Sequence, residues 1–266
     1  MWNRVEFKWN GKAAFKRNYG MSVLVTFVTT TLISGIATMI QTGAQPATEG
    51  EASGGAAMLA FVVSLLVLLL NIFVTHVLEV SNAKFFIMNQ SSAPGFDVVF
   101  EPFKSRGYLN TVKTLFLRDL YVFLWTLLGV VPGIIVITIV VFLCTAFLYD
   151  ANGFVVFLAV VLIFALIVAC CIPGVIKSYE YRMMHFILAE NPEMPSKEVF
   201  AISKAMMNGR KKDLFVLDLS FIGWSLLSGL TCGILGIFYV SPYIYATQAE
   251  VYAFNKAEAF RNGTIR

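Results

Sequence analysis

Charged residues are scarce in this chain of 266 amino acids, because Asp, Glu, Lys and Arg together make up only 14% of it. Water-soluble proteins carry roughly 25%. Apolar residues account for 58%, and the mean hydropathy is +0.75. This composition excludes a disordered chain. The apolar surplus lies in blocks of about 20 residues, the length that crosses a hydrocarbon core about 30 Å thick. The sequence therefore predicts a multi-pass membrane protein.

Residues that carry catalytic and metal chemistry are also rare. The chain has two histidines, His76 and His185, and no HExxH, P-loop or GxSxG motif. Four cysteines lie inside apolar stretches, with spacings unlike a zinc site or a disulfide framework: Cys144, Cys170, Cys171 and Cys232. We therefore expect no enzymatic activity, no metal and no cofactor.

Windows of about 19 residues predict six membrane spans, at residues 20–41, 58–79, 120–147, 154–176, 214–227 and 234–252. Pro132 predicts a kink in the third span. The apolar run 214–247 would be about 51 Å long as one helix, which is too long for a single crossing. It must fold back, and the small residues and glycines at 228–233 permit a turn there.

The positive charges predict the orientation of these spans. All 20 Lys and Arg residues fall in segments on one side, namely 4–17, 84–118, 177–212 and 256–266. The other side carries only Glu49, Glu51 and Asp150. Because cytoplasmic loops retain positive charge, both termini are predicted to be cytoplasmic. This topology accounts for the net charge of +4, so nucleic-acid binding is not expected.

An internal repeat relates two stretches of the chain. The segment LFLRDLYVFLWTLLGVVPG (115–133) aligns with LFVLDLSFIGWSLLSGLTC (214–232), which pairs Asp119 with Asp218 and Trp125 with Trp224. An amphipathic pattern that stops at a glycine precedes each copy, and the N-terminus resembles a fainter third copy. The predicted fold is therefore an all-α polytopic membrane bundle of about six transmembrane helices, arranged as hairpin repeats with short interfacial amphipathic helices.

These predictions give one integral membrane domain, 1–266, divided into seven segments. They are an amphipathic cytoplasmic N-terminus (1–19), a first hairpin (20–88), an interfacial segment (89–118), a second hairpin (119–176), a cytoplasmic helical segment (177–213), a third hairpin (214–252) and a cytoplasmic tail (253–266).

The repeated polar and aromatic residues are the first candidate site. Asp119 and Asp218 lie near the cytoplasmic ends of spans, where a helix dipole favours a carboxylate; an acid inside a membrane can also bind a cation or a proton. Trp125 and Trp224 lie deeper, where an indole either packs between helices or lines a cavity. Gly129 and Gly133, four residues apart, predict a close helix approach.

A second candidate is the basic cluster Arg210, Lys211 and Lys212. It serves either as a positive anchor at the start of a span or as a contact for anionic lipids. Just upstream, the acidic segment 190–198 contains Asn191-Pro192 and Pro195, which predict a turn between two helices. That turn is either a solvated connector or a docking surface for a partner.

Two long stretches bear a family resemblance. YEYRMMHFILAENPEMPSKEVFAISKAMMNGRKKDLFVLDLSFIGWSLLSGLTCGI from Tyr179, with SPYIYATQAEVY at 241–252, resembles an uncharacterised bacterial integral-membrane family, domain of unknown function nine-seven-five. The resemblance implies a multi-pass protein of the bacterial cytoplasmic membrane with no established activity. Many members have one Pro-Gly motif where this chain has VPGI at Val131 and IPGV at Ile172, which looks like an inserted hairpin.

Two functions remain open on the sequence. One is a non-enzymatic membrane protein that supports membrane assembly, envelope stress tolerance or lipid organisation. Its partners would be membrane lipids, other membrane proteins or a second copy of the chain. The other is a small-molecule or ion permease or exporter, with Asp218 and the two membrane-embedded tryptophans lining its pathway.

Overall fold

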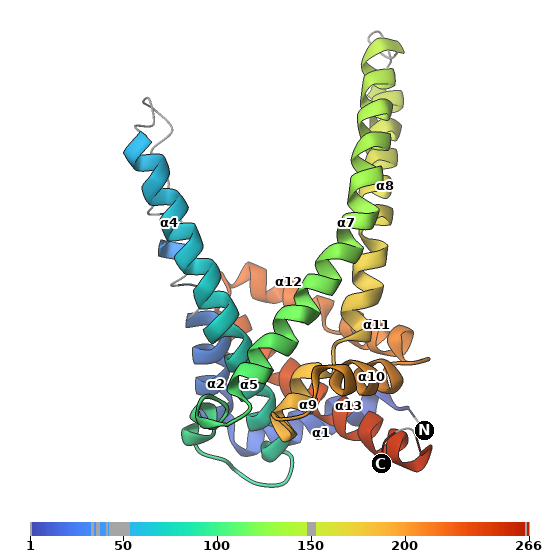
Figure 1. Ribbon diagram of the computed structural model, residues 1–266. Helices are drawn as coiled ribbons and strands as arrows, with labels where there is room; N and C mark the ends of the chain where they lie inside the picture. The colour runs from blue at the N-terminus through green and yellow to red at the C-terminus, as the bar shows by residue number, and fades with distance from the viewer. Residues whose placement is uncertain are drawn as a thin grey trace. The chain divides into compact units, whose positions relative to one another are not determined.

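The computed structural model describes residues 2–32, 35, 38–40, 42, 54–147, 153–263 and 265, and it is all-helical over these residues (Figure 1). The chain divides into two compact units. The first unit consists of Met1–Phe116 and Met183–Arg266, and the second unit is Leu117–Arg182. The predicted helical class is therefore confirmed.

Most helices belong to the first unit. In chain order they are α1 (Arg4–Arg17), α2 (Tyr19–Thr26), η1 (Phe27–Leu32), α4 (Gly54–Leu70), η2 (Asn71–Thr75), α5 (His76–Asn89), η3 (Phe96–Phe100), α6 (Glu101–Lys104), α9 (Met184–Glu190), α10 (Ser196–Met206), α11 (Lys211–Leu219), α12 (Ile222–Leu230), η4 (Gly236–Val240) and α13 (Ser241–Arg261). The second unit holds α8 (Gly153–Glu180) and most of α7 (Tyr108–Phe147).

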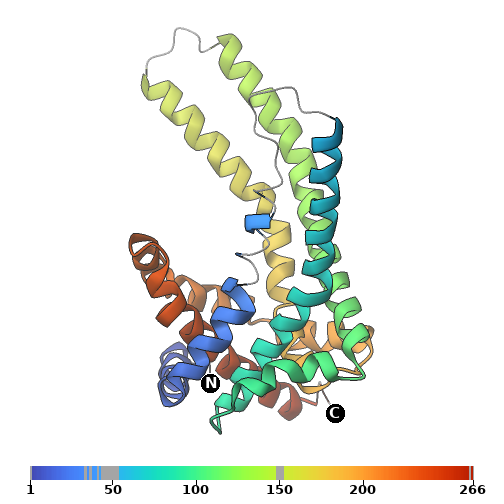
Figure 2. The same ribbon diagram turned by 90° about the vertical axis from the view of Figure 1, so that its left-hand side faces the viewer.

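The core of the first unit lies where α1, α5, α9, α10 and α13 gather, while α4 continues from α5 away from this core (Figures 1 and 2). Phe15, Phe85 and Phe186 are fully buried there, and the ring of Phe186 stacks on Tyr252 at 5.1 Å. Gly11 lets α1 lie against α13, since a Cβ at this position would come within 2.8 Å of the Thr247 backbone. The close contact of α1 with α13 therefore depends on the absence of a side chain.

Buried polar groups fasten the end of α1 to the end of α5. The Asn89 side chain is fully buried, where Nδ2 donates to the Ala14 carbonyl at 3.0 Å and Oδ1 accepts from Asn18 Nδ2 at 3.2 Å. The Arg17 guanidinium donates to the Asn89 carbonyl, which α5 itself leaves unpaired at its C-terminus. Such fully paired polar groups in a core fix one arrangement of the helices.

In the second unit, α7 and α8 run antiparallel as a long hairpin (Figure 2). They approach closely through small residues: a Cβ at Gly129 would clash with the Cys170 carbonyl, and one at Gly133 with the Cys170 sulfur. A Cβ at Gly174 would likewise clash with Thr126. The close approach predicted from Gly129 and Gly133 is therefore confirmed. The stretch between the two Pro-Gly motifs belongs to α7, α8 and their connection.

Four helices in the described residues are long and apolar enough to cross a membrane, namely Met58–Asn89, Tyr108–Phe142, Phe154–Glu190 and Lys211–Leu230. They coincide with the second to fifth predicted spans. Of the first predicted span, the described part holds a shorter apolar helix, Tyr19–Thr31, and much of the rest lies outside the described residues. The sixth predicted span falls on η4 and α13, which are not among the four.

The smaller predicted features can be compared in the same way. The short helices expected before each repeat are present as η3 with α6 and as α10. The turn expected at 228–233 follows the end of α12, where Cys232 and Gly233 have φ of 51° and 84°. α7 continues helically through Pro132. A break between α11 and α12 at Ser220 and Phe221 was not expected from the sequence.

Candidate functional site

A glycine turn sets up the most polar part of the first unit. α10 ends at Met206, and Gly209 adopts a φ of +75°, a left-handed conformation that favours glycine. The chain then reverses into α11, with Arg210 immediately before it. Opposite this turn, α13 carries Asn255 and Glu258, and Asn262 directly follows its last residue on the same face.

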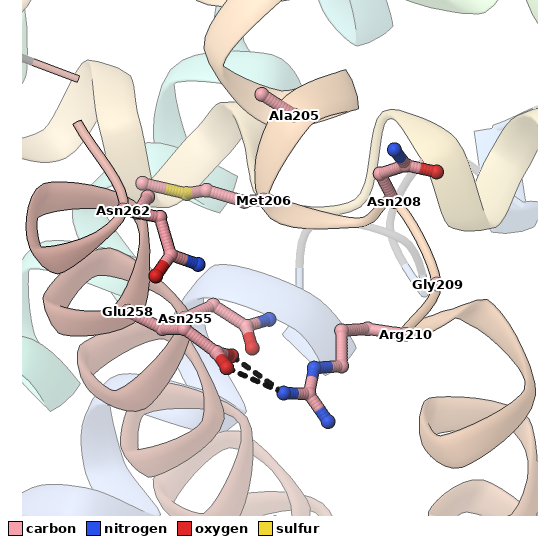
Figure 3. Close-up of a pocket in the computed structure, with 9 residues that line it drawn as sticks. Ala205, Met206, Asn208, Gly209, Arg210, Asn255, Glu258 and Asn262 are labelled. Carbon is pink, nitrogen blue, oxygen red and sulfur yellow. Dashed lines mark hydrogen bonds and ion pairs between the residues drawn. The ribbon is translucent and has the colours of Figure 1, made fainter. Parts of the chain in front are cut away.

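Arg210 and Glu258 form a two-pronged ion pair across this turn (Figure 3). Arg210 Nη2 lies 2.6 and 2.7 Å from the two carboxylate oxygens of Glu258, and Nη1 lies 3.5 Å from Asp213. The guanidinium carbon is 5.7 Å from the ring centres of both Trp2 and Phe254. Arg210 therefore connects the start of α11 to α13 and to the N-terminus.

A cavity of about 310 Å³ opens beside this ion pair. Its walls are rich in carboxamides and contain one charge of each sign: Ala205, Met206, Asn208, Gly209, Arg210, Asn255, Glu258, Ala259 and Asn262. Figure 3 shows that one wall comes from the α10–α11 turn and the other from α13. We call this space the amide cavity.

A second polar cluster lies on another side of α13. The hydroxyl of Tyr252 donates to Glu190 Oε2 at 2.7 Å, and Lys256 Nζ donates to the same oxygen at 2.5 Å. These residues border a cavity of about 320 Å³ that also includes Gln90 and Phe260. The cluster therefore links the C-terminal end of α9 to α13.

The acidic segment 190–198 forms the turn between α9 and α10, as the sequence predicted. A groove of about 480 Å³ runs along it and includes Glu193 and Glu198. Asn110 Nδ2, near the start of α7, donates to the carbonyls of Pro192 at 2.9 Å and Met194 at 2.8 Å. These bonds hold the turn in place.

The structure separates the members of the predicted basic cluster. Arg210 forms an ion pair with Glu258, and its side chain is 25% exposed. Lys211 is half-buried, and Lys212 is exposed. Of the three residues, Lys212 best meets the expectation of a cationic side chain that faces solvent or headgroups.

The repeated acids and tryptophans do not share one environment. Asp119 belongs to the second unit and accepts from Arg118 Nε at 2.7 Å, whereas Asp218 is half-buried in α11 of the first unit. Trp125 is 40% exposed, with Lys177 Nζ 4.8 Å from its ring. Trp224 is 37% exposed and lies 5.3 Å from the Tyr239 ring. Both indoles are therefore partly exposed, and their role in helix packing or in lining a cavity stays a prediction.

Lys8 reaches the break between α11 and α12. Its Nζ lies 3.2 Å from Ser220 Oγ and 3.4 Å from the Ser220 carbonyl, and 4.4 Å from the ring centre of Phe221. Burial, together with the nearby positive charge of Arg4, lowers the pKa of Lys8. This contact joins residues far apart in sequence, so no local pattern predicts it.

Sequence reasoning also missed Asn255, Glu258 and Asn262. The available signal was their spacing, which places them on one helical face. The sequence instead favoured a membrane span ending at residue 252, which assigned all three residues to a cytoplasmic tail.

The fold therefore defines an all-helical protein with four helices long and apolar enough to cross a membrane. The family model described as "Protein of unknown function (DUF975)" matches residues 1–257, and the chain belongs to this family. This confirms the resemblance and extends it to the N-terminal helices. No curated protein and no solved structure matches the chain.

Proposed function

We propose that this chain is a multi-pass protein of the bacterial cytoplasmic membrane that acts by binding rather than by catalysis. Its role would be in membrane assembly, envelope stress tolerance or lipid organisation. Its partners would be membrane lipids, together with other membrane proteins or a second copy of the chain.

The observation that carries this proposal is the bare surface of the four apolar helices. Only 6%, 6%, 0% and 17% of their most apolar windows are buried inside the chain. Exposing so much apolar surface to water is unfavourable, at roughly 25 cal/mol per Å², so lipid or other membrane helices must cover it. Most of the buried polar side chains belong to the first unit.

The distribution of charge supports the orientation and the finer architecture that we propose, with about six spans in hairpin repeats and both termini in the cytoplasm. In the second unit the only Lys and Arg residues are Arg118, Lys177 and Arg182, all near its two chain ends and none between 119 and 176. This is the asymmetry that the positive-inside rule describes.

Topology mapping tests the membrane proposal. Single cysteines would be introduced at Glu49, Asp150, Lys104 and Lys212 in a variant without native cysteines, and intact cells would be treated with an impermeant maleimide. We expect labelling at Glu49 and Asp150 only, with Lys104 and Lys212 labelled after lysis. Labelling of Lys104 or Lys212 in intact cells, or purification as a soluble protein without detergent, would refute the proposal.

A permease or exporter is the second candidate, and one observation favours it. The apolar helix Lys211–Leu230 is broken at Ser220 and Phe221, next to Asp218, and broken helices form ion and substrate sites in many transporters. Flux into proteoliposomes that disappears in Asp218→Asn but persists in the matched control Asp119→Asn would establish this function. If vesicles with the protein show no more flux than protein-free vesicles for any substrate in a broad panel, the permease function is refuted and the binding function remains.

A further inference from the structure

We infer that the amide cavity binds an uncharged, hydroxyl-rich group of about the size of one sugar ring. The cavity geometry carries this inference by itself. Only the choice of a lipid headgroup as the natural source of that group rests on the proposed membrane function.

The cavity is lined by a residue whose buried acceptor has no donor. Asn255 is only 2% exposed, and among the described residues its Oδ1 has no hydrogen-bond partner. Its Nδ2 lies 3.9 Å from the Met207 sulfur, a weak acceptor, so exchanging the two amide atoms would place the oxygen against a group that donates nothing. Leaving such an acceptor unpaired costs about 1–3 kcal/mol. A ligand that donates a hydrogen bond in this cavity relieves that cost.

The two charges beside the cavity favour an uncharged ligand. Arg210 and Glu258 both border the cavity, and their charges cancel through the two-pronged pair seen in Figure 3. An ionised phosphate would meet the Glu258 carboxylate and would bring acceptors only, so it could not satisfy Asn255. An ammonium group would meet the Arg210 guanidinium. An uncharged group avoids both repulsions.

The carboxamides around the cavity favour a ligand that both donates and accepts hydrogen bonds. Asn208, Asn255 and Asn262 line the cavity, and a carboxamide carries both donors and an acceptor. A hydroxyl group is likewise a donor and an acceptor at once. Several hydroxyls on a small ring therefore match carboxamides better than any group with a single hydrogen-bonding character.

The size and the position of the cavity agree with a single sugar ring. The volume of about 310 Å³ lies at the lower end of the roughly 300–1,000 Å³ typical of small-molecule sites, so one small ring fills it. Arg210 directly precedes the apolar helix Lys211–Leu230. If that helix crosses the membrane, the cavity lies at the depth of the lipid headgroups. The ligand is then the headgroup of a glycolipid or a free sugar with the same hydroxyls.

The test uses the full chain purified in a detergent without sugar groups. Binding of three probes is measured by native mass spectrometry and calorimetry: methyl glucoside, monoglucosyl-diacylglycerol and phosphatidic acid. We expect at least one glucoside to bind at least tenfold more tightly than phosphatidic acid. Glucolipid binding that methyl glucoside displaces indicates recognition of the headgroup alone, and glucolipid binding without displacement indicates that the acyl chains contribute.

Two variants probe the cavity itself. Asn255→Leu removes the unpaired acceptor, and Ala205→Leu fills the cavity without changing a polar group; each should weaken glucoside binding at least tenfold. The matched control is Asn82→Leu, because Asn82 is 1% exposed and its Oδ1 also lacks a partner among the described residues, yet it does not line this cavity. Its glucoside binding should be unchanged.

The inference is overturned if neither glucoside binds saturably at millimolar concentration, if phosphatidic acid binds more tightly than both, or if Asn82→Leu loses as much binding as Asn255→Leu. Methyl glucoside needs no bilayer for its binding. If it does not bind while the topology map is as proposed, the sugar site is refuted and the membrane function is not. A soluble, non-membrane chain that still binds methyl glucoside would refute only the proposed function.

Discussion

The ion pair between Arg210 and Glu258 gives the sharpest energetic prediction. We consider three variants: Glu258→Gln, which keeps the shape but removes the charge; Arg210→Met, which keeps an apolar stem; and the two changes combined. If the pair connects the start of α11 to α13, the double variant should be more stable than the sum of the two single losses implies. This is the signature of a direct interaction in a double-mutant cycle.

The magnitude follows from the geometry. Two charge-assisted hydrogen bonds of 2.6 and 2.7 Å join the groups, whose side chains are only 25% and 23% exposed. Hydrogen bonds to charged groups contribute about 1.5–3 kcal/mol, whereas fully exposed pairs contribute about 0–1 kcal/mol. Asp213 at 3.5 Å and Arg261 at 3.7 Å remain as substitute partners in the single variants. We therefore expect each single variant to lose about 2 kcal/mol and the coupling to be about 1–2 kcal/mol.

The assay is denaturant-induced unfolding of the purified chain in micelles, followed by tryptophan fluorescence and circular dichroism. A matched control is the pair Lys84 and Glu101, whose side chains are 30% and 46% exposed. The same cycle with Lys84→Met and Glu101→Gln should give a coupling below about 1 kcal/mol, because solvent screens exposed charges. Comparing the two coupling energies shows how much burial, and not opposite charge alone, contributes to the ion pair.

A coupling for Arg210 and Glu258 no larger than that of the control pair would refute this reasoning. So would a lipid result: if Arg210→Met weakens binding to anionic vesicles as much as Lys212→Met does, the guanidinium faces lipid rather than Glu258. We expect only the Lys212 variant to weaken such binding, by about 1 kcal/mol.

Three further predictions follow from single contacts. Gly133→Val should destabilise the hairpin of α7 and α8 by about 1–3 kcal/mol, as overpacking does, and thermal unfolding measures this loss. The control Gly223→Val should cause no such loss, because the Cβ position of Gly223 has open space around it. Tyr252→Phe should cost about 1 kcal/mol by removing the hydroxyl bond to Glu190, and an unchanged denaturation midpoint would contradict it. Burial lowers the pKa of Lys8 from 10.5, so the folded chain releases this proton more readily than the unfolded chain, and the free energy of unfolding should rise as the pH approaches 10.5. Lys8→Met should abolish that rise in unfolding curves measured across this pH range.

The apolar helices were predictable because their signal is local. The length and the apolar character of a continuous run can be read directly from the sequence. Four of the six predicted spans therefore coincide with long apolar helices. The close approach at Gly129 and Gly133 was predictable for a similar reason, since their spacing alone places both on one helical face.

The core of the first unit was not predictable in this way, because its contacts join distant parts of the chain. Arg210 looked like one member of a basic run, and only its pairing with Glu258 reveals a different role. Asp119 and Asp218 look equivalent in the repeat, yet the first is bound by the adjacent Arg118 and the second is half-buried in a broken helix. Similar local sequence therefore does not imply a similar environment.

The contact of α1 with α13 also constrains how the protein is made. At about 5–20 residues per second, the ribosome needs roughly 10–50 seconds after finishing α1 to complete α13. During that interval the surface around Gly11 lacks the helix it fits. Chains halted before α13 would keep this surface uncovered and would expose it to chaperones and proteases, because the contact forms only once α13 has been made.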